Sequence, residues 1–263
     1  MTNTAESRDQ SRLEATARKQ AKRAVIIQSN YVPWKGYFDL ISQADVVVLL
    51  DTVQSTKNDW RNRNQIKTQA GKLWISIPIR HSSSLRINEV QVADRAWARK
   101  HLQSITQAYA HAPHAAHWFP KLKDWYGDAA ECGHLSEINR LFIYRIANFL
   151  EIGSEFHEAE SVLSYPEHDA MDPTRRLVEI CKRVGATTYL SGPAAKSYLD
   201  ETSFAAESIA VEWFDYSGYP PYQQLHGQFD PAVSILDLIL MTGPNARQYA
   251  FKTQLPTNNG VFQ

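Results

Sequence analysis

Residues 51–68, with the sequence DTVQSTKNDWRNRNQIKT, concentrate side chains that can bind an anionic or sugar-bearing ligand. The arginines offer planar pairs of donors, each asparagine offers a donor and an acceptor, and tryptophan offers a stacking surface. A polar run of this kind also occurs as a solvated face without a function. We interpret it as a binding segment, in which the candidate residues are Gln54, Lys57, Trp60, Arg61, Asn62, Arg63 and Asn64.

A second polar segment, QSNYVPWKGYF at residues 28–38, carries aromatic rings around a glycine. It directly follows the apolar run AVII, so we expect it to form a corner at the end of a strand. Gly36 would let the chain turn closely past a ligand. The alternative is that Tyr31 and Trp34 only cover the core. The candidate binding residues of this corner are Gln28, Asn30, Tyr31, Trp34, Lys35 and Tyr37.

Two histidines and two aspartates are candidates for proton transfer. His81 lies in the loop RHSSSLR and His226 lies in the sequence QQLHGQ, and either is the candidate general base. Asp51 or Asp237 is the candidate carboxylate partner of that base. The sequence therefore predicts a catalytic pair of one histidine and one carboxylate, and it leaves the choice within each pair open.

The turn SGP at residues 191–193 follows the apolar run TTYL. Ser191 could act as a nucleophile, but the sequence around it is not the GxSxG elbow of α/β-hydrolases. We favour a small turn at a strand end, in which Ser191 and Gly192 contact a ligand. Tyr222 and Gln223, from the aromatic and proline-rich loop that begins at residue 219, complete the predicted substrate-binding set.

The sequence predicts no metal site. His111, His114 and His117 are spaced by three residues, but Pro113 interrupts any common helical face and no acidic partner is local. The two cysteines, Cys132 and Cys181, form no CxxC pair, which argues against a zinc site or a disulfide framework.

Apolar periodicity predicts the elements that must position these residues. The runs at 24–28 and 44–51 are read as buried strands, and GYFDLISQ between them is read as a short helix. Two apolar strands joined by a helix form a βαβ unit, which favours a parallel α/β sheet. Ligands of such sheets bind at the carboxyl ends of the strands, where the 28–38 corner is expected to lie.

Further strands are expected at 72–79, at 87–92, over TTYLS and at 209–216. Helices are expected over 95–112, 135–153 and 172–186, after 193 and at the end of 219–244. Asp172 followed by Pro173 marks the start of the helix at 172–186, and Gly185 marks its end. The predicted fold is thus an α/β domain with a mostly parallel sheet, flanking helices and a Rossmann-like arrangement. It would span residues 24–250 with a helical insertion, or subdomain, at about 95–151. Residues 1–23 are predicted to be a disordered N-terminal tail, and 251–263 a C-terminal tail.

Bulk composition excludes several classes of protein. Lys and Arg together number 28, as do Asp and Glu, so no net charge recruits nucleic acid. No stretch has the roughly 18 apolar residues of a membrane span, and the N-terminus lacks the apolar centre of a signal peptide. We therefore expect a soluble, cytoplasmic protein that acts on a small molecule.

The segments QSNYVPWKGYFDLI, DTVQSTKNDWRNRN, YLSGPAAKSYL and YQQLHGQFDPAVSILDLILMTGP, in this order and spacing, resemble the WbqC-like family of bacterial proteins. The similarity covers roughly residues 24–245 and departs at Gln28-Ser29, where the family usually has Gln-Pro. Members are often encoded with surface-polysaccharide and O-antigen biosynthesis. The resemblance implies a transferase-like role on an aminosugar or a similar amine-bearing metabolite.

The order of elements is also distantly similar to that of HIGH-type nucleotidyltransferases, although PWKGYF lacks the histidines of their turn. Two hypotheses follow. In the first, the protein is a transferase that moves an acyl or aminoacyl group, with a carrier protein as a candidate donor, onto an amine of an activated sugar such as a nucleotide sugar. In the second, it is a non-catalytic module that binds a nucleotide or a nucleotide sugar for a partner enzyme. The sequence identifies no cofactor.

Overall fold

The computed structural model describes residues 21–80 and 84–252, and its centre is a five-stranded sheet in which every strand pair is parallel. The strands are arranged in the order β7, β2, β1, β8, β9. Their bounds are Arg23–Ile27 for β1, Val46–Leu49 for β2, Glu155–Glu158 for β7, Thr188–Ser191 for β8 and Ala210–Trp213 for β9. The predicted α/β class with a mostly parallel sheet is confirmed.

The direction of chain winding reverses between β1 and β8. From β1 the chain adds β2 and then β7 on one side, and afterwards it crosses over to add β8 and β9 on the other side. The ladder between β1 and β8 pairs only Arg23 with Thr188 and Ala24 with Tyr189. The two strands therefore separate before their carboxyl ends, which opens a crevice at the topological switch point of the sheet.

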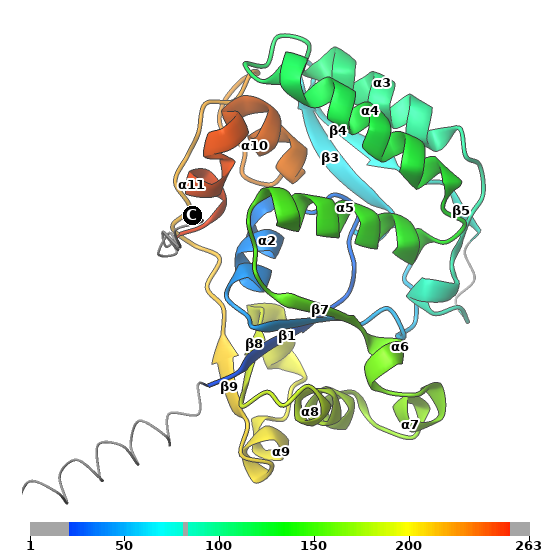
Figure 1. The fold of residues 1–263 in the computed structure, drawn as a ribbon, viewed down its shortest axis with the longest axis vertical. Coiled ribbons are helices and arrows are strands. Elements are labelled where there is room, and N and C mark those ends of the chain that lie inside the picture. Colours follow the sequence, from blue (N-terminus) through cyan, green and yellow to red (C-terminus); the bar gives the residue numbers. More distant parts are fainter. Residues whose placement is uncertain (1–20, 81–83, 253–263) are drawn as a thin grey trace, which may run out of the picture.

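Helices cover both faces of this sheet, as Figure 1 shows. On one face lie α6 (Ala159–Val162), α7 (Tyr165–Asp169), α8 (Pro173–Arg183) and α9 (Glu201–Ala206). On the other face lie α2 (Lys35–Ser42) and α5 (Leu135–Phe149). Within β2, Val47 and Leu49 belong to one buried cluster, and Val46 and Val48 belong to the other. Both faces of a strand are thus buried, which explains its continuous apolar sequence.

A second layer packs over α2 and α5. It consists of a hairpin, two long helices and the C-terminal helices, all of which share the larger core cluster. The bounds are Arg63–Thr68 for β3, Gly71–Ser76 for β4, Ile79–Arg80 for β5, Gln91–Val92 for β6, Trp97–Ala108 for α3, Ala115–Glu131 for α4, Ile235–Thr242 for α10 and Ala246–Ala250 for α11; short 3-10 turns occupy Ile87–Glu89, Pro193–Ser197 and Gly243–Asn245.

Three strand regions differ from the strands predicted from sequence. The strand β3 lies inside the polar run at 51–68, where no strand was predicted, and Asn64 and Lys67 are buried in it beside Ile66. The short strand β7, EFHE, carries no apolar pattern and was not predicted. The expected strand at 87–92 is a 3-10 turn followed by only two strand residues.

The ordered core is slightly longer than the sequence indicates. The strand β1 begins at Arg23, and the carbonyl of Lys22 accepts a hydrogen bond from Thr187 N at 2.9 Å. At the other end, Phe251 is buried in the larger core cluster. The remainder of both predicted tails, 1–20 and 253–263, lies outside the described residues, as does His81.

Candidate functional site

The corner after β1 has a strained backbone that the surrounding structure holds in place. Val32 has φ +36°, a conformation that a β-branched residue rarely adopts. Its carbonyl accepts from Asn64 Nδ2 at 2.9 Å and from Ser234 Oγ at 2.8 Å. Ile235 N donates to the carbonyl of Pro33 at 3.0 Å. The hairpin and α10 thus fix the path of residues 28–34 past the carboxyl edge of the sheet.

A cavity of about 920 Å³ opens at the carboxyl ends of β1 and β8, and we call it the switch-point cavity. Its volume falls within the range of 300 to 1,000 Å³ that is typical of small-molecule and cofactor sites. Four residues predicted from the sequence line it, namely Gln28, Gln54, Ser191 and Gly192. The cavity therefore lies where the topology of the sheet predicts ligand binding.

Gly192 permits close packing at the wall of this cavity. A side-chain carbon on Gly192 would lie 3.1 Å from the hydroxyl oxygen of Tyr216, which also lines the cavity. Ser191 Oγ donates to the hydroxyl of Tyr189 at 3.2 Å. The predicted small turn at the strand end is present, and the hydrogen bond of Ser191 is to a phenol rather than to a base.

The opposite wall is the N-terminal turn of α8. Asp172 caps this helix by accepting from Arg175 N at 3.0 Å, and Thr174 and Arg176 face the cavity from the first turns. An α-helix of 11 residues presents partial positive charge at this end, which favours a bound anion. The carboxylate of Asp172 opposes that effect at the rim.

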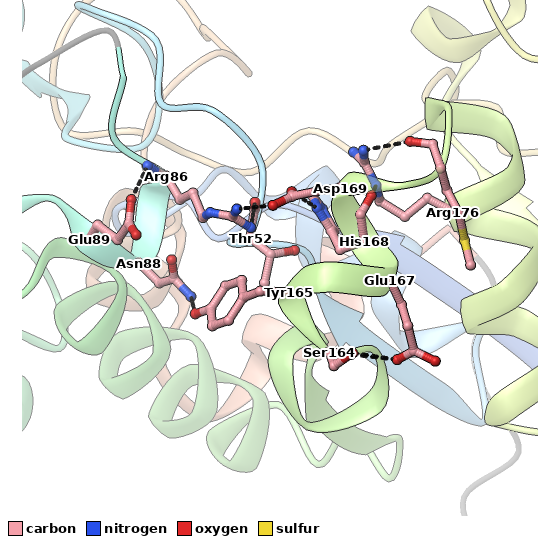
Figure 2. A network of polar contacts seen from close by, with 11 residues as sticks. Thr52, Arg86, Asn88, Glu89, Ser164, Tyr165, Glu167, His168, Asp169 and Arg176 are labelled. Atoms are coloured by element: carbon pink, nitrogen blue, oxygen red, sulfur yellow. Dashed lines mark hydrogen bonds and ion pairs between the residues drawn. The ribbon is translucent and has the colours of Figure 1, made fainter.

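A polar network holds Arg176 at the rim, as Figure 2 shows. The guanidinium of Arg176 donates to the carbonyls of His168 at 3.2 Å and Met171 at 3.0 Å. From the other side, Arg86 pairs with Asp169 at 2.7 Å and donates to the carbonyl of Thr52. Two cations thus approach the segment before α8 from opposite sides and fix it against the end of β2.

A smaller hollow of about 260 Å³ lies on the other side of the corner. We call it the tryptophan pocket, because Trp34 and Trp60 line it together with Asn30, Pro33, Asn64 and Ala232. The ring of Trp34 contacts that of Tyr216 with a centroid separation of 5.4 Å. Since Tyr216 lines the switch-point cavity, this ring pair stands between the two hollows.

Gly36 makes room for a tryptophan ring rather than for a ligand. A side-chain carbon on Gly36 would lie 2.3 Å from Cζ2 and 2.5 Å from Cη2 of Trp34. The indole therefore lies over the first turn of α2, and only glycine leaves space for it. This packing places Trp34 between the two hollows.

Several predicted binding residues are engaged by the protein itself. Lys35 is buried, and its Nζ donates to the carbonyls of Pro220 at 3.1 Å and Tyr249 at 3.0 Å. Burial lowers the pKa of Lys35 to about 8. The hydroxyl of Tyr31 contacts His101 Nδ1 at 2.9 Å inside the helical layer. These side chains stabilise the corner and the loops around it.

Several predicted binding residues of the 51–68 segment also contact other parts of the protein. Asn62 is buried and donates to the carbonyl of Ile77 at 3.0 Å, and Arg61 pairs with Asp59 at 3.0 Å. The guanidinium of Arg63 lies 4.3 Å above the ring of Trp74. Lys57 of the same segment is exposed. In the 28–38 corner, Tyr37 is buried and donates to the carbonyl of Gln28 at 3.3 Å.

The candidate carboxylates are both buried. Asp237 accepts from Tyr222 at 2.7 Å, from Gln224 at 2.9 Å and from Tyr109 at 2.9 Å, so three donors enclose it. Asp51 accepts from Ser29 N at 2.9 Å through Oδ1, while its buried Oδ2 has no hydrogen-bond partner among the described residues. Burial raises the pKa of both carboxyl groups.

The structure describes one of the two candidate bases, His226. The Nε2 of His226 donates to the carbonyl of Ala108 at 2.9 Å, which ties its loop to the end of α3. His81 lies outside the described residues. The histidine and carboxylate pairing therefore stays a prediction.

Sequence reasoning missed four residues that line the switch-point cavity. They are Thr174 and Arg176 of α8, Tyr198 directly after the 3-10 turn Pro193–Ser197, and Tyr216 after β9. The cap signal Asp172-Pro173 marked the start of α8, and the position of that start at the carboxyl edge follows from the parallel topology. Gln223 is exposed, whereas its neighbour Gln224 is buried against Asp237.

The described part of the chain has neither a candidate metal site nor a helix that could span a membrane. Within residues 21–80 and 84–252, no three His, Cys, Asp or Glu side chains gather so that they could hold a metal ion. Over the same residues, every helix is too short or too polar to cross a lipid bilayer.

A doubly wound parallel sheet with a ligand-sized cavity at its switch point defines an α/β protein of the Rossmann-like class. Within that class, the family model described as the WbqC-like protein family matches residues 28–249, and the chain belongs to this family. It is 40% identical over 233 residues to the uncharacterized protein Rv1507c of Mycobacterium tuberculosis. The aligned region covers 87% of this chain and 97% of Rv1507c. No solved structure matches the chain significantly.

Proposed function

We propose that this WbqC-like protein is a transferase whose substrate is an activated, amine-bearing sugar, bound through its nucleotide in the switch-point cavity. The observation that carries the proposal is the position of that cavity, between the separated ends of β1 and β8 and against the first turn of α8. Crevices at this point of open α/β sheets are the usual sites of nucleotides.

The lining of the cavity fits a phosphorylated ligand. Arg176 supplies a planar cation, and the turn at Gly192 lets a ligand approach the backbone. Tyr198 and Tyr216 supply aromatic surface for a base or a ribose, and Gln28 and Gln54 supply amides at its edge. The volume of about 920 Å³ is sufficient for a nucleotide-sized molecule.

The transfer step follows the role of the family in surface-polysaccharide biosynthesis that the sequence resemblance implies. An acyl or aminoacyl group, delivered as a thioester of a carrier protein, would be moved onto the amine of the sugar. The amide bond forms as the thioester bond breaks, and the carrier thiol leaves with the proton that the amine loses. That amine must lose a proton as the new bond forms. His81 or His226 remains the proposed base, and Asp51, with its unpaired Oδ2, is the proposed carboxylate partner.

One observation favours a second candidate function, a binding module without catalysis. The described residues that line the switch-point cavity include no histidine, cysteine or lysine, and the carboxylate of Asp172 is used as the cap of α8. On this hypothesis the protein presents a nucleotide sugar to a partner enzyme, and the cavity serves binding alone.

Calorimetric titration tests the proposal. We expect at least one of UDP, GDP, dTDP, CDP and ADP to bind, and its sugar conjugate to bind as well. Gly192→Val should abolish binding, because the added carbons would meet the ring of Tyr216. The matched control is Gly133→Val, since a side-chain carbon on Gly133 meets no atom within 4 Å. Absence of binding by every nucleotide would contradict the proposal.

Turnover separates the two candidate functions. With a nucleotide that binds, transfer of an acetyl, glycyl or other acyl group from coenzyme A or from an acylated carrier protein to the hexosamine conjugate is followed by mass spectrometry. A mass increase equal to the group supports the transferase. Tight binding without transfer from any donor favours the binding module.

A further inference from the structure

We propose that the tryptophan pocket is the subsite for the sugar ring, so that a nucleotide sugar lies with its nucleotide in the switch-point cavity and its pyranose beyond the Trp34–Tyr216 ring pair. This inference rests on the proposed function and assigns a second hollow to the same ligand. The pocket is separate from the cavity and shares none of its lining residues.

The size and walls of the tryptophan pocket fit one neutral ring. Its volume of about 260 Å³ is below the range of whole drug-sized ligands. Trp60 is 47% exposed, an uncommon state for a tryptophan in a folded protein, and its ring contacts that of Trp74 at 5.4 Å. Such an exposed aromatic wall offers a flat face on which the apolar side of a sugar ring can stack.

The polar groups of the pocket fit the hydroxyls or the amine of a sugar. Asn30 lines it, and the Oδ1 of Asn30 is buried without a hydrogen-bond partner among the described residues. An unpaired buried acceptor costs free energy unless a ligand donates to it. No charged residue occurs among the lining residues, so the pocket suits the sugar and not the phosphates.

The walls of the two hollows adjoin each other. Gln28 lines the switch-point cavity and Asn30, two residues further along the chain, lines the tryptophan pocket. The contact between Trp34 and Tyr216 joins their walls at a centroid distance of 5.4 Å. A nucleotide sugar whose diphosphate passes the edge of this ring pair would contact both hollows, and this is the arrangement that we infer.

Ligand truncation combined with mutation tests this assignment. We measure by calorimetry the affinities of UDP, GDP and dTDP and of their hexose and hexosamine conjugates. Trp60→Ala should weaken a conjugate about tenfold, as expected for the loss of one stacking surface, and leave the bare nucleotide unchanged. The control is Trp213→Ala, which removes a tryptophan that lines neither hollow. Asn30→Ala should reduce the preference for the hexosamine over the hexose conjugate.

Each outcome decides one claim. If a nucleotide binds but Trp60→Ala weakens the nucleotide and its conjugate equally, or weakens neither, the sugar subsite lies elsewhere and the proposed function stands. If no nucleotide binds while methyl glycosides bind the wild type but not Trp60→Ala, the pocket binds sugars and the proposed nucleotide site is wrong. If neither kind of ligand binds, both proposals fail.

Discussion

Adding one carbon atom at Gly36 tests how the corner is built. In Gly36→Ala the new methyl group would lie 2.3 to 2.8 Å from three atoms of the Trp34 ring, so the indole must move. Overpacking of this kind costs about 1 to 3 kcal/mol of unfolding free energy. Replacing glycine by alanine within a helix raises the free energy of unfolding by about 0.5 to 1 kcal/mol. We therefore expect a net loss of up to about 2.5 kcal/mol, centred near about 1 kcal/mol, measured by urea denaturation.

Gly127→Ala is the matched control for this variant. Gly127 lies inside α4, and a side-chain carbon there meets no atom within 4 Å. This variant should gain about 0.5 to 1 kcal/mol from helix propensity alone. Because the displaced ring forms the partition between the two hollows, Gly36→Ala should also weaken nucleotide-sugar binding, and Gly127→Ala should not. Equal stabilisation by both substitutions would refute the position of Trp34 over α2.

Three further predictions concern the site and its pH dependence. Trp34→Phe keeps most of the packing volume but removes part of the aromatic wall, so nucleotide-sugar affinity should fall while the unfolding midpoint barely moves. A large drop in the midpoint with normal affinity would show that Trp34 only stabilises the fold. Asp172→Asn keeps the helix cap and removes a negative charge at the cavity rim, so a nucleoside diphosphate should bind about twofold to fivefold more tightly, and weaker binding would exclude phosphate at this end of α8. Burial lowers the pKa of His101 from 6.5 to about 4, so on acidification the unfolded chain binds a proton at this histidine before the folded protein does. Going from pH 7 to pH 5 should therefore remove about 2 kcal/mol of the unfolding free energy. Urea titrations of His101→Gln should lack this loss.

The sequence was sufficient to predict β1, β2 and the carboxyl edge of the sheet at which the switch-point cavity lies, but not the edge strand β7. Continuous apolar runs predicted β1 and β2 because strands that are buried on both faces lack alternation. The Asp172-Pro173 cap predicted the start of α8, and the structure has the side chain of Asp172 in that cap. Local rules of capping and burial apply within a few residues, so one sequence reveals them.

The composition of the cavities could not be predicted in the same way. The sequence does not show whether a buried polar side chain forms hydrogen bonds within the protein or with a ligand. Asn64 was predicted to bind a ligand, but its amide donates to the carbonyls of Tyr31 and Val32. The tyrosines of the switch-point cavity, Tyr189, Tyr198 and Tyr216, lie near predicted segments, but nothing in their own sequence indicates that they face the cavity. The separation of β1 from β8, which opens that cavity, depends on pairing between strands that lie more than 160 residues apart.

A crystal structure of the protein with a bound nucleotide sugar tests the central claim most directly. The account predicts the nucleotide between the carboxyl ends of β1 and β8, with its diphosphate near Gly192 and the first turn of α8. The same crystal should show the sugar ring against Trp60. A nucleotide bound elsewhere on the molecule, with the switch-point cavity empty at saturating ligand, would contradict it.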